Sequence, residues 1–256
     1  MPTSSVSASV KKLETELGIK LFERSSNKIK LNEYGRIFLS ALQETDDIIK
    51  KARADMLNLS GTPSGEIRLL ILTNRRRVTE TIAQFKIKYP GISFSIKHQN
   101  QTEHTGYNEY DIVISDRHIN SDRFDSKLWT REEILLAVHK SNPLSEKNFV
   151  TLKDLKNEKF ICMPKNSSIR DLMDNFFEGE GITADIAIEC DDPQYLRKYV
   201  EIGLGVTFFP SVSWGRQISD SVSLVRINKG IYRDTYIHTA KNAPDGVKLF
   251  SMEMTK

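Results

Sequence analysis

The segment Ser4–Leu39, SSVSASVKKLETELGIKLFERSSNKIKLNEYGRIFL, carries the most regular pattern in the chain. Its first apolar residues recur at spacings of four, three and four, at Val6, Val10, Leu13 and Leu17. This spacing predicts a helix with one apolar face. The hydroxyl of Ser4 or Ser5 can cap its start, and Gly18 ends it. The side chains on the opposite face of the helix are small, polar or cationic.

After Gly18, the sequence IKLFERSSNKIKLNEYG indicates two short strands around a Ser-Ser-Asn-Lys turn. Lys28 and Lys30 alternate with Ile29 and Leu31, which is the period of a strand. A helix, a short strand, a basic turn and a second short strand form the back half of a winged helix-turn-helix.

Positive charge is concentrated in this opening segment. Residues 1–36 contain seven Lys or Arg against four Asp or Glu, and the formal net charge of the whole chain is +3. The remainder of the chain is therefore balanced in charge. This asymmetry indicates an anionic polymer as the partner of the front and a different partner for the back.

Residues 32–60 form one long helical pattern without proline. Its apolar residues, from Tyr34 and Phe38 to Met56 and Leu59, follow three- and four-residue steps that approximate a heptad. The apolar face of so long a helix needs a partner. We interpret it as a dimerisation helix rather than as a helix packed on its own domain. The following SGTPSGE has the composition of a linker.

Beyond Gly65, strand and helix patterns alternate in two series. The first has the strands EIRLLIL, ISFSIKH, DIVIS and EEILLAVHK and the helix RVTETIAQFKIKYP. The second has the helices TLKDLKN, SSIRDLMDNFFEGEG and DPQYLRKYVEIG and the strands KFICM, DIAIEC and GVTFFP. VSLVRI and RDTYIHTA are late strands, and GVKLFSMEM is a final helix. Such alternation predicts mostly parallel sheets wrapped by helices, in two lobes.

Composition excludes several classes of protein. Hydrophobic residues make up 39% and charged residues 28%, as in globular proteins. The apolar runs are much shorter than the roughly 20 residues that span a bilayer, and the N-terminus lacks a signal-peptide pattern. We therefore expect a cytoplasmic protein. It shows no nucleophile elbow, paired catalytic carboxylates or phosphate loop, so we expect no enzyme.

Cysteine and histidine spacing does not indicate a metal or a cofactor. Cys162 and Cys190 lie in apolar strand patterns without a CxxC motif, so buried thiols are expected, with redox sensing as the alternative. The five histidines lack the paired spacing of a metal site. The GLG at residues 203–205 is a helix-to-strand turn, because no third glycine opens a helix.

Twelve positions of the opening segment fit the pattern S-x-S-x-x-I-x-x-L-E-x-x-L-G-x-x-L-F-x-R, followed by a basic turn and L-T-x-x-G. They are Ser5, Ser7, Val10, Leu13, Glu14, Leu17, Gly18, Leu21, Phe22, Arg24, Leu31 and Gly35; Asn32 replaces the usual Thr. In this pattern the segment resembles the recognition helix and wing of LysR-type transcriptional regulators. GEIRLLIL, LLAVHKSNPL, FICMPKNSSIRDLMDNFF and VEIGLGVTFFP also match family segments in order.

The resemblance implies an α/β fold class. A partial winged helix-turn-helix (residues 1–35) and a linker helix (36–60) would precede an effector-binding domain (66–256) of the type 2 periplasmic-binding-protein kind. That domain would have two Rossmann-like lobes, lobe I (66–139 and 241–256) and lobe II (140–240). The implied function is DNA-binding transcriptional regulation, controlled by a small-molecule effector held between the lobes.

The family's DNA-binding domain normally starts about 30 residues earlier, with the helices that position the recognition helix. We therefore expect a shortened product, arising from a misplaced start codon, an internal start or a degraded gene. The alternative function is a truncated small-molecule sensor that does not bind DNA, or a dominant-negative subunit that oligomerises with full-length partners.

The resemblance also implies the DNA contacts. Base and phosphate contacts are expected from one face of the first helix, and phosphate contacts from the basic wing. The residues are Thr3, Ser4, Ser5, Ser7, Ala8, Ser9 and Lys11 of the helix and Arg24, Lys28 and Lys30 of the wing. The alternative is a solvated helix face.

Ligands of open α/β sheets bind at the carboxyl ends of strands, near helix N-termini. This rule predicts an effector site made of Thr73, Asn74, Arg75, Asn100, Gln101, Thr102, Asp116, Arg117, Asn166, Ser167 and Ser168, with Asp192 and Pro193 in the wall.

Three arginines in NRRRV, residues 74–78, lie where a strand meets a helix and could hold a carboxylate or phosphate. An anionic effector is thus one hypothesis; the alternative is that one arginine faces the cleft and the others are solvated. The partners implied by the resemblance are double-stranded DNA, the effector and further copies in a homodimer or homotetramer, with RNA polymerase left open.

Overall fold

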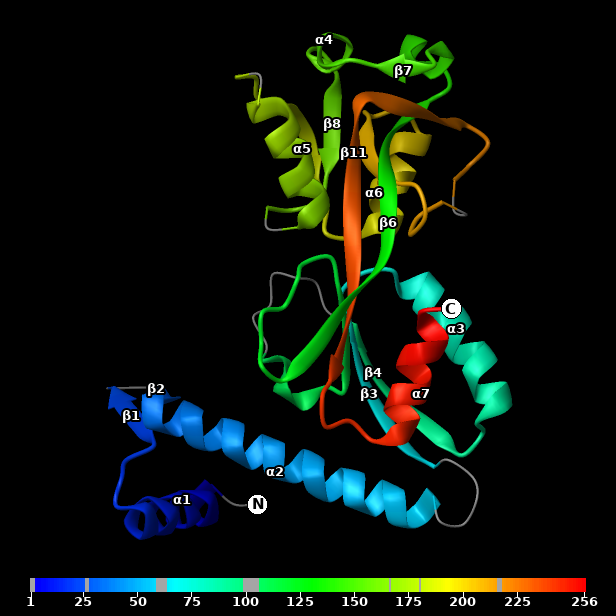
Figure 1. Ribbon diagram of the computed structural model, residues 1–256. Coiled ribbons are helices and arrows are strands. Elements are labelled where there is room, and N and C mark those ends of the chain that lie inside the picture. Colours follow the sequence, from blue (N-terminus) through cyan, green and yellow to red (C-terminus); the bar gives the residue numbers. More distant parts are fainter. Residues whose placement is uncertain are drawn as a thin grey trace.

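The computed structural model describes residues 3–25, 28–58, 64–98, 106–165, 167–179, 181–215 and 218–256. In Figure 1 a helix–hairpin unit and a long helix lie at the bottom, below two α/β bodies joined by two long strands. The body next to the long helix is called lobe I, and the body at the top is called lobe II. The predicted fold class is confirmed: a partial winged helix-turn-helix, a long helix and two lobes.

The N-terminal unit consists of α1 (Thr3–Leu17) and the hairpin of β1 (Phe22–Ser25) and β2 (Lys28–Leu31). Glu14 joins them, because its Oε1 accepts hydrogen bonds from the backbone N–H groups of Leu21, at 2.8 Å, and Phe22, at 3.3 Å. The bond from Leu21 is the main reason why the pKa of Glu14 is lowered. Glu14 thus sets the angle between the helix and the hairpin.

The long helix α2 (Glu33–Asn58) begins beside this hairpin. Asn32 caps it: its Oδ1 accepts from the N–H of Gly35 at 2.8 Å, while its Nδ2 donates to the carbonyl of Lys20 at 2.7 Å. The Asn in place of the usual Thr is therefore a functional cap. Many apolar side chains along α2 stay exposed: Tyr34, Ile37, Leu39, Leu42, Ile48, Ile49 and Met56.

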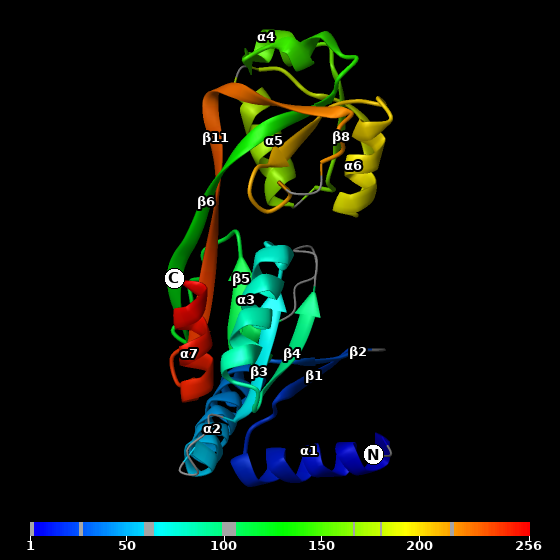
Figure 2. The same cartoon turned by 90° about the vertical axis from the view of Figure 1, so that its right-hand side faces the viewer.

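Lobe I contains β3 (Gly65–Ile71), α3 (Arg75–Lys88), β4 (Ile92–His98), η1 (Tyr107–Glu109), β5 (Ile112–Ser115) and α7 (Asp245–Met254). The strands β3, β4 and β5 are parallel, with β3 in the middle. The helices α3 and α7 pack on them through Phe85 and Phe250, whose ring centroids are 5.0 Å apart. The carboxyl ends of these strands point towards lobe II (Figure 2).

Lobe II contains η2 (Pro143–Glu146), β7 (Phe149–Val150), α4 (Leu152–Leu155), β8 (Lys159–Cys162), α5 (Ser168–Glu178), β9 (Asp185–Glu189), α6 (Pro193–Glu201) and β10 (Thr207–Pro210). Successive residues of β8 face opposite sides, as strand geometry requires. Phe160 packs with α5 and Ile161 packs with α6. Lobe II therefore has a helix on each face.

Two long strands connect the lobes. β6 (Phe124–His139) and β11 (Val222–Ala240) pair antiparallel along almost their whole length. Phe124 and Ile237 belong to the core of lobe I, whereas Ile134 and Val225 belong to the core of lobe II. Both strands thus contribute to both cores.

The prediction of mostly parallel sheets is wrong for these strands. The large sheet has the order β10-β6-β11-β5-β3-β4, and the ladders β10–β6, β6–β11 and β11–β5 are antiparallel. VSLVRI and RDTYIHTA form one strand instead of two, with a register irregularity between Arg226 and Ile231. Lys229 and Gly230 have positive φ at this irregularity. The sequence there therefore resembles that of a turn, although the strand continues through it.

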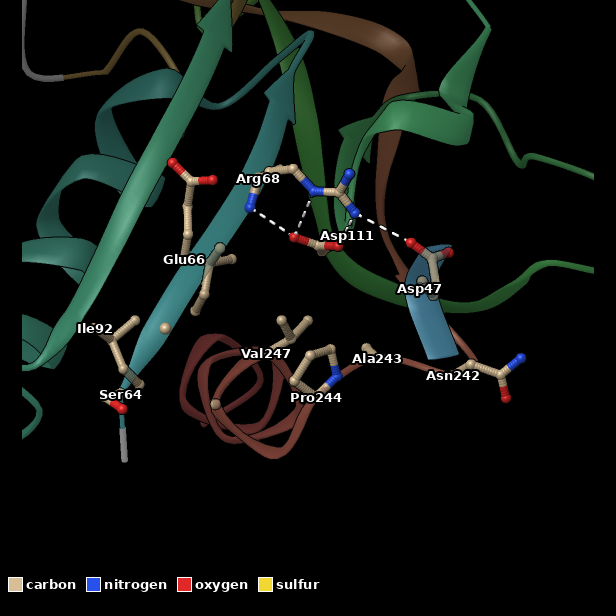
Figure 3. Close-up of a pocket in the computed structure, with 14 residues that line it drawn as sticks. Asp47, Ser64, Glu66, Arg68, Ile92, Asp111, Asn242, Ala243, Pro244 and Val247 are labelled. Atoms are coloured by element: carbon tan, nitrogen blue, oxygen red, sulfur yellow. Dashed lines mark hydrogen bonds and ion pairs between the residues drawn. The ribbon is translucent and has the colours of Figure 1, made fainter. Parts of the chain in front are cut away.

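The linker helix is fixed to lobe I by charges (Figure 3). Asp47 of α2 accepts from Arg123 Nη2 at 2.7 Å and from Arg68 Nη2 at 3.3 Å, and Arg68 also binds Asp111 at 2.5 Å. These side chains are largely buried. One polar face of α2 therefore packs on its own domain, while its apolar side chains remain available to a partner.

Asp47→Asn removes one charge from this junction. We expect the free energy of unfolding to fall by about 1–3 kcal/mol, since both arginines lose a charged acceptor. Urea titration measures the loss. Glu44→Gln, at an exposed position of α2 three residues earlier, is the control and should change stability by less than about 0.5 kcal/mol. Equal effects of the two variants would contradict the role of Asp47.

A buried histidine lies in lobe I. His238 of β11 is fully buried between two serines: Nε2 lies 2.9 Å from Ser115 Oγ, and Nδ1 lies 2.7 Å from Ser126 Oγ. Burial is the main reason why the pKa of His238 is lowered to about 4. The neutral ring is therefore part of the folded state.

Because the unfolded chain binds this proton at a higher pKa than the folded chain, stability should fall as the pH drops from about 6.5 towards 4. Between pH 7 and pH 4.5 the His238 contribution is about 2 kcal/mol. Urea unfolding of the wild type and of His238→Gln between pH 7 and pH 4.5 isolates the contribution of His238. The difference in unfolding free energy between the two proteins should shrink by that amount, and a constant difference would refute the assignment.

Candidate effector cleft and DNA-binding surface

The predicted DNA contacts lie on α1 and the hairpin. The side chains of Ser7, Ala8, Ser9 and Lys11 are exposed along α1, and Lys30 is exposed on β2, opposite Glu23 of β1. Thr3, Ser4 and Ser5 lie in α1, Arg24 in β1 and Lys28 in β2, but their side chains lie outside the described part of the structure. The structure thus presents the described contact candidates to solvent.

The predicted effector site lies where β3 and β5 end. Thr73 and Asn74 follow β3 and are 8% and 4% exposed. Asn74 has a left-handed backbone, with φ 55°, and its Nδ2 donates to Thr235 Oγ1 of β11 at 2.8 Å. Its Oδ1 is buried without a hydrogen-bond partner among the described residues. This corner of lobe I therefore contacts the connecting strands directly.

Asp116 follows β5, and its side chain is 3% exposed. It accepts a short hydrogen bond from Ser168 Oγ, at the start of α5 in lobe II. Ser167 caps the same helix by accepting from the N–H of Arg170 at 3.2 Å. Burial is the main reason why the pKa of Asp116 is raised. Asp116 and Ser168, both predicted as site residues, meet across the lobes.

Two further contacts cross between the lobes. Arg117 Nη2 lies 2.6 Å from Asp171 Oδ2 of α5, at an exposed edge. Arg76 Nη2 of α3 donates to the carbonyl of Val212, after β10, at 3.1 Å. These contacts and the Asp116–Ser168 bond enclose the corner where β3, β5 and α5 meet.

Sequence patterns did not reveal the charged pair at the centre of the connecting strands. Glu132 of β6 and Arg233 of β11 are direct cross-strand partners, with Arg233 Nη2 at 2.5 Å and Nε at 3.0 Å from Glu132 Oε1. Glu132 also accepts from the backbone N–H groups of Val212, at 2.9 Å, and Ser213, at 2.8 Å. The pair thus connects both strands to the loop after β10.

One signal for this pair was present. Glu132 is in phase with the buried Ile134 and Leu136, and Arg233 with the buried Thr235 and Ile237. In a strand, residues two apart share a face. Phase alone would therefore have indicated that both charges are buried.

Two families of known proteins match this chain. Residues 60–250 match the LysR substrate binding domain, and residues 1–36 match the bacterial regulatory helix-turn-helix protein of the lysR family. The chain belongs to the LysR family of transcriptional regulators.

Known LysR-family proteins resemble it over most of its length. The uncharacterized HTH-type transcriptional regulator YybE of Bacillus subtilis is 29% identical over 215 residues, which cover 81% of this chain and 73% of YybE. A full-length OxyR variant from Pseudomonas aeruginosa superposes with a TM-score of 0.71 at 18% identity, over 98% of this chain and 85% of that one. The CcmR regulatory domain of Synechocystis PCC6803, in complex with 2-PG, superposes with a TM-score of 0.68 at 19% identity. The match covers 75% of this chain and 96% of that one. The two structural likenesses show a shared fold.

In this LysR-family chain, the three arginines of NRRRV lie in different surroundings. Arg76 pairs with Glu80 at 2.7 Å in addition to Val212, and Arg77 stacks on the ring of Trp129, 4.5 Å from its centroid. Arg75 is exposed. The guanidinium groups thus go to separate partners, since consecutive positions on a helix point in different directions.

The other predicted effector residues are distributed as follows. Asp192 caps α6 by accepting from the N–H of Gln194 at 2.7 Å, and Pro193 is the first residue of that helix. Asn100, Gln101, Thr102 and Asn166 lie outside the described residues.

A cavity of about 350 Å³ lies at the opposite end of lobe I from this corner (Figure 3). It is bordered by Asp47 of α2, the start of β3 and the start of α7, including Pro244 and Val247. It is separate from the predicted site between the lobes. Its polar rim contains the Asp47–Arg68–Asp111 contacts, so the cavity belongs to the linker junction.

No group of three or more His, Cys, Asp or Glu side chains suited to a metal occurs in the described part of the chain. Cys162 is buried, which raises the pKa of its thiol to about 11 and disfavours the thiolate; Cys190 is half-buried. No helix among the described ranges is long and apolar enough to cross a membrane.

Glu132→Gln should destabilise the protein by about 3 kcal/mol, because Arg233 would keep a buried charge without its carboxylate. The neighbouring Glu133→Gln is the matched control. Glu133 is 27% exposed, and its carboxylate lies 3.9 Å from Arg226, so the loss should be below about 1 kcal/mol. Urea denaturation measures both changes. A loss for Glu132→Gln no larger than that of the control would show that the buried pair adds nothing.

Proposed function

We propose that this LysR-family regulator contacts DNA through α1 and the β1–β2 hairpin and responds to a small molecule held where β3, β5 and α5 meet. The observation that carries the proposal is the set of three contacts across the lobes, which link Asp116 to Ser168, Arg117 to Asp171 and Arg76 to Val212. A ligand at this corner must replace or strengthen these contacts. It would thereby change the angle between the lobes.

The proposed division of the chain follows the packing of its cores. The DNA-binding part is residues 1–35, the linker 36–60 and the effector-binding domain 66–256. We place the lobe boundary inside β6 and β11, near Glu132 and Arg233, rather than after His139 and Ala240. The support is that Ile134, on the lobe II side of Glu132, belongs to the lobe II core, whereas Ile237, on the lobe I side of Arg233, belongs to the lobe I core.

The proposed DNA surface combines hydroxyl groups with cations. Ser7 and Ser9 can donate to or accept from base edges or phosphates, whereas Lys11 and Lys30 neutralise phosphates. All four side chains are exposed. The other predicted contacts, Thr3, Ser4, Ser5, Ala8, Arg24 and Lys28, belong to the same proposal.

The proposed oligomer forms through α2. Its exposed apolar residues include Leu42, Ile49 and Met56, which recur every seven residues, as in a helix–helix seam. Exposed apolar surface of this kind marks an interaction site. A homodimer or homotetramer would bring several DNA-contacting units together, and a contact with RNA polymerase remains a prediction from the family resemblance.

The test is a gel shift with duplexes selected by the protein from a random library. Lys11→Ala and Lys30→Ala should each weaken binding to the selected duplex about 3- to 10-fold and lower the slope of log affinity against log salt by about 1. Lys153→Ala, an exposed lysine of α4 in lobe II, is the control and should leave both unchanged.

Two outcomes would contradict this assignment. If no duplex is enriched and the protein still forms oligomers, the chain acts as a sensor subunit that does not itself bind DNA. If Lys153→Ala weakens binding as much as Lys11→Ala, the DNA surface lies elsewhere.

A further inference from the structure

The cavity of about 350 Å³ lies between Asp47 of the linker helix α2 and the start of β3 and α7 in lobe I (Figure 3). Protein interiors are packed so closely that few voids are larger than a water molecule. Ligand pockets, in contrast, have volumes of about 300–1,000 Å³. The cavity thus has the size of a small-molecule site rather than that of a packing defect.

The cavity runs from an exposed rim to a buried floor. Gly65 and Glu66 at its rim are exposed, whereas Ile67, Ile92 and Val247 on its floor are each 1% exposed. A Cβ atom added to Gly65 would meet nothing within 4 Å among the described residues, so the space beside the rim is open. A molecule that enters from solvent therefore reaches apolar side chains.

Contacts that are already made hold the walls of the cavity apart. At Gly246, α7 lies so close to β4 that an added Cβ atom would be 3.0 Å from Ile92 Cδ1, so α7 has no room to move inward. On the other side, Asp47 holds α2 at a fixed distance through Arg68, at 3.3 Å, and Arg123, at 2.7 Å. The space between is lined by small residues: Ser64, Gly65, Ala240, Ala243 and Gly246.

The buried charges beside the cavity are paired with each other. Asp111 accepts from the backbone N–H of Arg68 at 2.8 Å, from its Nε at 3.1 Å and from its Nη2 at 2.5 Å. Over the described ranges, no side chain that lines the cavity has a buried polar atom without a hydrogen-bond partner. A ligand therefore gains nothing by replacing these bonds, and its favourable contacts are with the apolar floor.

The charges around the cavity also disfavour an anion. Its lining includes the carboxylates of Asp47, Glu66 and Asp111 and, in the part of the chain that the structure describes, one guanidinium, that of Arg68. Arg68 already binds two of these carboxylates. A negatively charged ligand would meet like charges here, whereas an uncharged ligand would not.

We propose that this cavity is a second ligand site, which binds an uncharged, apolar molecule of about two fused rings. The size follows from comparison with an apolar cavity of about 150 Å³, which holds one benzene ring. The inference goes beyond the proposed function and does not depend on it. The corner between the lobes follows the carboxyl end of β3, whereas this cavity lies at its amino end, at Gly65. A molecule bound here contacts both α2 and lobe I and stabilises their present arrangement.

The test uses the full chain with indole and indole-3-acetate, which share one bicyclic ring system and differ in charge. At millimolar concentration and constant ionic strength, indole should raise the melting temperature by about 2 °C or more, because it binds the folded chain. Indole-3-acetate should leave the melting temperature unchanged. The proposal is overturned if indole has no effect, or if indole-3-acetate raises the melting temperature as much as indole does.

Ala243→Leu tests the position of the site. Ala243 is buried and lines the cavity, so the larger side chain occupies the space that the ligand needs. Isothermal titration with indole should give a Kd at least tenfold weaker than that of the wild type. Ala187→Leu, at an exposed position of β9 in lobe II, is the matched control and should keep the wild-type Kd. A folded Ala243→Leu that binds indole like the wild type would exclude this cavity.

A measurement on the wild type covers the case in which Ala243→Leu does not fold. In a chain labelled at the isoleucine methyl groups, the ring of bound indole should shift the NMR signals of Ile67 and Ile92, on the cavity floor. The signal of Ile114, near the corner between the lobes, should stay in place. A shift of Ile114 without shifts of the other two would place indole between the lobes and refute the proposal. None of these results alters the gel shift, which tests DNA binding separately.

Discussion

The antiparallel pair β6–β11 is the constraint on which the two-lobed structure depends. Its ladder runs from Val222 opposite His139 to Ala240 opposite Phe124, through both hydrophobic cores. Each lobe packs one end of these two strands into its own core. The lobes therefore cannot separate without breaking a continuous ladder.

The charged pair Glu132–Arg233 lies on the ladder between the two hydrophobic cores. At this point the strands carry a carboxylate and a guanidinium that also bind the loop after β10. An apolar pair would be at least as stable in a rigid core. Directional hydrogen bonds instead fix one arrangement of the two strands and the loop after β10.

Periodicity predicted most elements of the fold correctly, because their local and tertiary requirements agree. Val78 and Phe85 of α3 are buried as the helical spacing requires, and β8 and β10 show continuous apolar runs because helices cover both faces. The long strands were predicted poorly for the opposite reason. The half of β6 before Glu132 is rich in exposed polar residues, and the Asn-Lys-Gly within β11 resembles a turn. Each strand is continuous because it pairs with the other one. The sequence of one strand alone gives no information about this pairing.

The site shows the same limit. Asp116 and Ser168 were predicted from the rule that ligands bind at strand ends, because the backbone alone brings those positions together. The roles of the arginines depend on side-chain partners far away in sequence: Arg77 stacks on Trp129, and Arg76 reaches Val212. Similarly, the sequence of α2 did not distinguish Asp47 from its neighbours. Its role depends on Arg68 and Arg123, which only the fold brings beside it. Arg123 immediately precedes β6, so the residue that anchors the linker helix is adjacent in the chain to the strand that joins the lobes.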